Sequence, residues 1–176
     1  MDGELWDVTD AEGVPVGRVH RRGDPGFPTG LFHIVSAVCV VRDDGRVLIT
    51  QRAVAKDWAL SWEFPAGSAL AGETSGNAAV RELREETGLV ALPESLELVG
   101  RVTEATALLD LYVAHGVRRS TLTLDPKEVR DAAWVPLAEV RARCEDGQMA
   151  GPWVERLAVL WDALVRASKV ARPYPQ

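Results

Sequence analysis

Short runs of alternating apolar and polar residues fill the first third of the chain, with turn-forming residues between them. The strand pairs that this pattern predicts are 5–8 with 14–19 around the turn 10–13, and 31–41 with 46–51 around the turn 43–45. Each arrangement is typical of a β-hairpin. We therefore expect an N-terminal hairpin and, after the Gly- and Pro-rich stretch 22–30, the first strands of a core sheet.

The second half of the chain continues the mixture of strands and helices. Strand patterns cover 96–103, 107–114 and 131–135, and a short helix is expected over 137–144. A longer amphipathic helix starts at Gly151-Pro152, and apolar residues recur in it at helical spacing. Its predicted packing face consists of Val154, Leu157, Leu160, Trp161, Leu164 and Val165. Composition and pattern alone predict a mixed α/β domain.

One more helix is predicted between the two groups of strands, over 77–87. Thr74 or Ser75 can cap its N-terminus, and Gly88 can supply the left-handed residue that ends it. At 100° per residue, Val80, Leu83 and Thr87 share one face, and three glutamates share the other. Those glutamates are Glu82, Glu85 and Glu86.

Three carboxylates on adjacent helical turns repel one another, and a hard divalent cation such as Mg²⁺ or Mn²⁺ would remove that repulsion. A helix rich in Glu and Arg is more often a solvated, salt-bridged surface. Gly67 and Glu73, at fixed distances before the helix, favour the metal site over that alternative.

The segment from 67 to 89 resembles the signature of the Nudix hydrolases, G-x5-E-x7-R-E-U-x-E-E-x-G-U with U aliphatic, and every fixed position is filled. The resemblance implies an α/β/α sandwich with a mixed sheet and a C-terminal helix. It also implies that 31–176 form the Nudix domain and that 1–30 form a hairpin extension with a linker.

Other stretches are similar to the branch of this family that includes isopentenyl-diphosphate isomerase. They are 33–38, 47–53, 56–58 and Trp62, with 6–13 and 151–153 as looser matches. An isomerase would need a cysteine just after Trp62 and a histidine at position 26, where this chain has Glu63 and Gly26. These departures favour hydrolysis and leave the isomerase as the less favoured alternative.

The resemblance also implies roles for particular residues. Glu82, Glu85 and Glu86, with the main-chain carbonyl of Ala66, would bind Mg²⁺, which Mn²⁺ can replace. Arg81 would orient the carboxylates, with Glu73 as its ion partner. The general base stays open between Glu82, the first choice, and the later residues Glu104 and Glu128. Arg52 could hold a phosphate, with a surface arginine as an equal alternative. Trp58 and Trp62 could stack on a base, and core packing is the alternative for Trp62.

Composition narrows the range of substrates. The 176 residues carry a net charge of −6 without a long basic block, so we expect no nucleic acid polymer as partner. The absence of a long apolar run predicts a cytoplasmic protein with no membrane contact. The expected activity is hydrolysis of a nucleoside diphosphate joined to a group X that the sequence leaves open. A non-catalytic nucleotide sensor is the alternative from another class, and the hairpin edge could support a homodimer.

Overall fold

The computed structural model describes residues 3–117 and 121–169. In chain order its elements are β1 (Leu5–Thr9), β2 (Pro15–Arg21), β3 (His33–Val41), β4 (Arg46–Arg52), β5 (Trp62–Glu63), β6 (Ala66–Ser68), α1 (Ser75–Thr87), a 3₁₀ turn (Pro93–Ser95), β7 (Leu96–Thr103), β8 (Ala107–His115), β9 (Val129–Pro136), α2 (Leu137–Glu145) and α3 (Gly151–Lys169). This architecture confirms the predicted α/β fold, with its mixed sheet, N-terminal hairpin and C-terminal helix.

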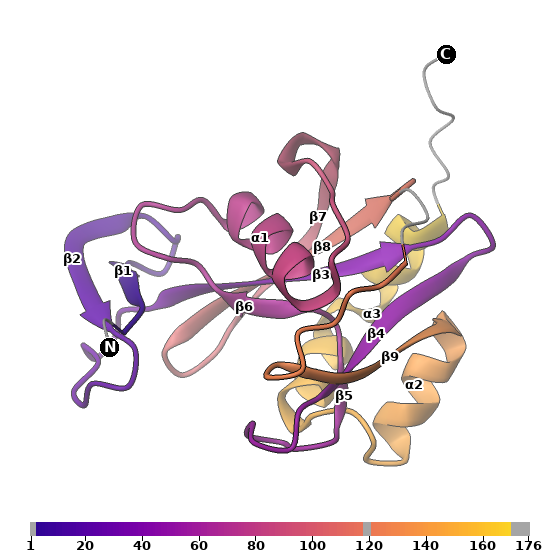
Figure 1. Cartoon of the computed structure of the whole chain (residues 1–176). Helices are drawn as coiled ribbons and strands as arrows, with labels where there is room; N and C mark the ends of the chain where they lie inside the picture. Colours follow the sequence, from indigo (N-terminus) through magenta and orange to yellow (C-terminus); the bar gives the residue numbers. More distant parts are fainter. Residues whose placement is uncertain (1–2, 118–120, 170–176) are drawn as a thin grey trace.

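The core sheet has the strand order β5-β4-β3-β8-β7, and β6 and β9 pair with β3 and β4 (Figure 1). β3 runs parallel to β8, and the other pairs of this sheet are antiparallel. β3 and β4 pair at Val41 with Val47 and then separate. Beyond that point β6 pairs with Val35–Ala37 of β3, so the first signature residue, Gly67, lies in the sheet beside β3.

Helices cover both faces of the sheet (Figure 1). Alternate side chains of β3 point to opposite faces, as the period of a strand requires. Cys39 packs in one apolar cluster with Leu157 and Leu160 of α3, while Val38 packs in a second cluster with Leu83 of α1. The helix that carries the three glutamates is therefore fixed by its own apolar face.

Two details of the prediction were wrong or incomplete. Val154 was placed on the packing face of the last helix, but it is 40% exposed, whereas Trp153, one residue earlier, is fully buried. The apolar face is thus rotated toward Trp153. β5 and β6 were not predicted, since strands of two and three residues are too short to show alternation.

The N-terminal hairpin forms a two-stranded sheet of its own and is tied to the core. Thr9 and Phe32 exchange two backbone hydrogen bonds of 2.7 and 2.9 Å, and the ring of Trp6 stacks on His33 at a centroid distance of 4.1 Å. Val16 and Val19 on β2 are exposed. Among the described residues, no helix has the length and hydropathy required to span a bilayer.

Candidate active site

Helix α1 is built as its sequence dictates. The Thr74 hydroxyl accepts a hydrogen bond from the backbone N–H of Asn77 at 3.2 Å, which caps the N-terminus. Gly88, at φ 74°, ends the helix and donates its N–H to the carbonyl of Arg84. Leu83 and Thr87 are buried. The helix is therefore held at both ends and along one face.

Arg81 is the centre of an ion-pair network on α1. Its guanidinium donates to both carboxylate oxygens of Glu73 at 2.9 Å, to Glu82 at 2.7 Å, to Glu85 at 3.1 Å and to the carbonyl of Ser68 at 2.9 Å. Although burial opposes ionisation of Glu73, the hydrogen bonds from Arg81 and from the Leu70 N–H lower its pKa. Hydrogen bonding to Glu73 likewise raises the pKa of Arg81. Arg81 therefore fixes the loop before α1 to the helix.

Glu86 has a different environment from its two neighbours on the helix. Its side chain is buried, and within the described chain its Oε2 atom has no hydrogen-bond partner. Burial raises the pKa of Glu86 well above its usual range, and the nearby charges of Glu63 and Glu82 raise it further. Burial also raises the pKa of Glu82, against the effect of Arg81. A buried carboxylate oxygen without a partner is costly unless a cation or donor binds it.

A pocket of about 300 Å³ collects most of the predicted site residues; we call it the catalytic pocket. Its lining includes Arg52, Ala66, Gly67, Glu82, Glu85, Glu86 and Glu128, all predicted, and Glu4, Arg22, Val35, Lys56, Ser68 and Asp125, which were not. Residues from the N-terminal hairpin region, β4, β6, α1 and the segment before β9 therefore meet at one place.

Three cations of the catalytic pocket are each paired with a carboxylate. Arg22 lies 2.8 Å from Glu4. A single nitrogen of Arg52, Nη1, donates to both oxygens of the buried Glu63 at 2.7 and 2.9 Å. Lys56 pairs with Glu128. Arg22 and Lys56 were missed because their distance along the chain from the signature hides their place in the pocket.

Five predicted site residues lie outside the lining of the catalytic pocket, namely Glu104, Trp58, Arg81, Glu73 and Gly88. Glu104, in the turn between β7 and β8, accepts hydrogen bonds of 2.6 and 3.0 Å from Arg156 of α3. The indole of Trp58 lies against Gly151, where an added β-carbon would come within 2.4 Å of the ring. Arg81, Glu73 and Gly88 hold α1 and the loop before it, as described above.

The carboxylates of α1 offer the oxygen ligands that a hard divalent cation prefers. In the described chain no three acidic, His or Cys side chains converge into a metal-binding group, because Arg81 draws Glu82 and Glu85 toward itself. The unpartnered Oε2 of Glu86 supplies a ligand that is already free. A turn of Glu82 and Glu85 away from Arg81 would complete an all-oxygen donor set of the kind that Mg²⁺ prefers.

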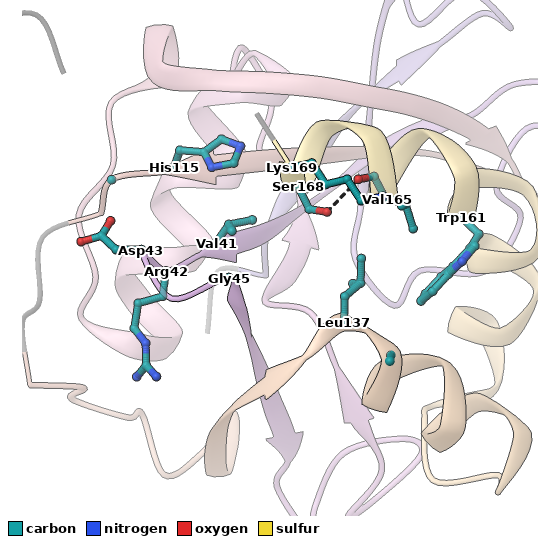
Figure 2. Close-up of a pocket in the computed structure, with 12 residues that line it drawn as sticks. Val41, Arg42, Asp43, Gly45, His115, Leu137, Trp161, Val165, Ser168 and Lys169 are labelled. Atoms are coloured by element: carbon teal, nitrogen blue, oxygen red, sulfur yellow. Dashed lines mark hydrogen bonds between the residues drawn. The ribbon is translucent and has the colours of Figure 1, made fainter. Parts of the chain in front are cut away.

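A larger hollow of about 590 Å³ lies elsewhere, between the β3–β4 turn, the start of α2 and the C-terminal half of α3 (Figure 2). Leu137, Trp161 and Val165 form apolar parts of its wall, and Arg42 extends away from it toward Asp44. None of the predicted site residues lines it. The chemistry is therefore concentrated in the smaller, more polar catalytic pocket.

The fold and the helix with three carboxylates are typical of one class of protein, and comparison with known proteins identifies that class. Residues 31–157 match the family model of the NUDIX domain. The chain therefore belongs to the Nudix hydrolase family, an enzyme family.

Individual proteins resemble the chain over most of its length. The chain is 33% identical over 153 residues to an uncharacterized Nudix hydrolase of Listeria monocytogenes, covering 82% of this chain and 87% of the relative. It is 34% identical over 162 residues to an isopentenyl-diphosphate Δ-isomerase of Nocardia farcinica, covering 88% and 89%. A crystal structure from Deinococcus radiodurans superimposes with a TM-score of 0.73 over 90% of this chain and 99% of that one, at 20% identity, and so supports the fold.

Proposed function

We propose that the chain is a Mg²⁺-dependent pyrophosphohydrolase that cleaves a nucleoside diphosphate joined to a group X by attack of water on phosphorus. The unpartnered, buried carboxylate oxygen of Glu86, beside Glu82 in the catalytic pocket, carries this proposal. It marks a place where a cation offsets the penalty of burying negative charge. The pocket measures about 300 Å³, a size that suits a small-molecule substrate.

Glu82, Glu85, Glu86 and the carbonyl of Ala66 would hold the Mg²⁺ ion, and Mn²⁺ can replace it. When bound, this ion neutralises diphosphate oxygens and lowers the pKa of bound water. Arg81 acts as a positioning residue, because it contacts two of these carboxylates and the Ser68 carbonyl next to the signature glycine. Glu73 holds Arg81 from the opposite side.

Glu82 is our first choice for the general base that removes a proton from the attacking water. Its raised pKa, caused by burial, makes it a stronger proton acceptor than an exposed carboxylate. Glu128 lines the same pocket and is the second candidate. Glu104 is the third, and its ion pair with Arg156 would have to open before it could accept a proton.

Phosphate binding is assigned to the cations of the catalytic pocket. Arg52 was the predicted residue, and Arg22 and Lys56 join it in the lining. Guanidinium and ammonium groups bind phosphate oxygens by charge-assisted hydrogen bonds. A diphosphate held here would share the pocket with the α1 carboxylates.

Isomerisation of an isopentenyl diphosphate is the second candidate, favoured by the 34% identity with the Nocardia enzyme. The positions of the cysteines weigh against it. Cys39 is fully buried in the core cluster next to α3, and Cys144 lies on α2. Neither lines the catalytic pocket, so neither could reach a bound substrate there.

The test is a panel of diphosphates assayed for phosphate or nucleotide release with Mg²⁺, with Mn²⁺ and with chelator. We expect metal-dependent turnover of at least one nucleoside diphosphate derivative, and loss of it in Glu85→Gln. A Glu145→Gln variant, at the exposed end of α2 and outside the lining, is the matched control. Turnover that persists in chelator would overturn the metal assignment. Nucleotide binding without turnover would instead indicate a non-catalytic sensor. Conversion of isopentenyl diphosphate to its isomer would indicate the isomerase.

A further inference from the structure

The segment 53–61, here called the β4–β5 loop, forms one lip of the catalytic pocket. It begins after Arg52, and it contains Lys56; both side chains line the pocket. In Figure 1 the loop lies at the lower edge of the view, between the labelled strands β4 and β5. A group attached to a diphosphate that Arg52 and Lys56 hold therefore lies within reach of this loop.

Large apolar side chains are unusually exposed in the β4–β5 loop. Val54 is 64% exposed, Trp58 is 56% exposed and Leu60 is 45% exposed. Single exposed apolar residues are common, but a group of them beside a polar cleft is typical of a binding surface. An indole ring offers a flat face on which another aromatic ring can stack.

The backbone of this loop is also strained. Trp58 and Leu60, at φ 55° and 65°, are the non-glycine residues with left-handed backbone in the ranges 3–117 and 121–169. Branched and bulky residues avoid this region unless the surroundings impose it, and such strain gathers at ligand-binding sites. The loop therefore maintains a conformation that its own residues disfavour.

Arg52 imposes this conformation. Its backbone N–H donates to Ser61 at 3.0 Å, its carbonyl accepts from Leu60 at 3.2 Å, and its Nε donates to the carbonyl of Asp57 at 2.6 Å. The residue that would hold a phosphate thus also fixes the residue next to Trp58. The indole packs on Gly151 at the start of α3, which limits its motion further.

We propose that Trp58, together with the exposed Leu60 and Val54 of the same loop, selects substrates whose group X carries an aromatic ring. This inference rests on the proposed hydrolysis of a diphosphate in the catalytic pocket. With the diphosphate at Arg52 and Lys56, the ring of X stacks on the exposed indole. Because the loop is already ordered, little conformational entropy is lost on binding.

Two substrates that share an ADP half test this directly: diadenosine diphosphate, whose X is aromatic, and ADP-ribose, whose X is a sugar. In Trp58→Ala we expect KM for diadenosine diphosphate to rise roughly 5- to 150-fold, the range that loss of one stacked base implies. Its kcat and the KM for ADP-ribose should change little. Trp58→Phe should retain most of the preference. Calorimetry with a methylene-bridged diadenosine analogue gives the same comparison without turnover.

Two further variants make the test independent of folding defects. Leu60→Gly relieves the left-handed strain, so its Tm should rise while KM for diadenosine diphosphate also rises. Val159→Ala removes a side chain that is 68% exposed on α3. It should change neither Tm nor KM for diadenosine diphosphate.

Equal loss for both substrates in Trp58→Ala would overturn the proposal, as would self-association of the wild-type chain that Trp58→Ala abolishes. The proposal would also be overturned if neither substrate were turned over and Trp58→Ala bound the methylene-bridged analogue as tightly as the wild type does. Absence of turnover alone, with Trp58-dependent analogue binding, would overturn the hydrolytic function and leave the aromatic site in place.

Discussion

Gly67 and Glu82 lie so close together that a β-carbon on Gly67 would stand 2.1 Å from the carboxyl carbon of Glu82. The carboxyl group of Glu82 thus occupies the space that a side chain at the first glycine of the signature would need. Its backbone does not require a left-handed conformation, since only close approach excludes a side chain there. The glycine and the glutamate are therefore one structural unit, although fifteen positions separate them in the sequence.

Gly67→Ala should displace the Glu82 carboxylate and lower kcat by roughly 10²-fold or more, the scale of a lost general base. The fold should survive, because the clashing group is the end of a side chain. Steady-state kinetics at saturating Mg²⁺ and thermal melting provide the two measurements. Gly76→Ala is the matched control: its nearest neighbour would lie 3.9 Å away, so activity should persist and α1 should gain up to about 1 kcal/mol. Normal kcat in Gly67→Ala would contradict the role of this contact.

Glu86→Gln should have opposite effects on stability with and without metal. In the absence of divalent cations the substitution removes a buried charge near Glu63 and Glu82, so Tm should stay equal or rise. The increase in Tm that Mg²⁺ gives the wild type should shrink or vanish, since a ligand that binds the folded state stabilises it by mass action. Melting curves over a Mg²⁺ titration measure both effects. A variant that unfolds without metal would show that Glu86 supports the fold instead of the cation.

Gln substitution at Glu82, Glu128 and Glu104 should rank the candidate bases. We expect Glu82→Gln to lower kcat most, by roughly 10²- to 10⁴-fold, with little change in substrate affinity. Glu104→Gln should mainly weaken the contact between the β7–β8 turn and Arg156 and so affect Tm more than kcat. The assay is kcat as a function of pH at saturating Mg²⁺. A larger loss in Glu128→Gln would place the base on the segment before β9.

His33 should make the stability of the fold depend on pH. Burial between the hairpin and the core lowers its pKa, against the hydrogen bond to the Thr106 carbonyl. The unfolded chain therefore takes up the proton first, near pH 6.5. Above that pH both states are neutral at this residue and its contribution is constant. As pH falls from 6.5 toward the lower folded pKa, stability is lost by up to about 1.4 kcal/mol per pH unit.

Denaturant unfolding of the wild type and of His33→Gln between pH 5 and 8 measures this contribution as a difference. The charges near His33 come from Glu104, which raises its pKa, and from His20 and Arg22, which lower it. The carboxylates titrate in both proteins, so their contributions to the unfolding free energy cancel in the difference. Parallel curves for the two proteins would mean that His33 takes no part in the pH dependence.

Local pattern predicted those parts of the fold whose causes are local. Thr74 and Gly88 bound α1 as the capping rules require, and the glycine turns place the hairpins. Trp153 shows where this approach failed, since a face offset by one residue still shows helical spacing. The two short strands that hold Gly67 beside β3 arise from tertiary pairing, which no local period encodes.

The candidate site was predictable only as far as the signature extends. The signature placed Glu82, Glu85 and Glu86 on one face of α1. The cations that line the same pocket have no such pattern: Arg22 follows the hairpin and Lys56 lies in an irregular loop. Glu63 was noted only as a departure from the isomerase, yet it holds Arg52 at the pocket. These partners depend on how distant strands meet, which a single sequence does not reveal.

The internal pairing of Arg22, Arg52 and Lys56 has a consequence for how ligands enter. An incoming phosphate competes with Glu4, Glu63 or Glu128 for its cation, so binding is in part an exchange of one anion for another. Such an exchange changes the net number of ion pairs little, and affinity should therefore depend only weakly on salt concentration. This competition also favours ligands of higher charge. A diphosphate can outcompete these carboxylates, whereas a monophosphate product competes less well and leaves.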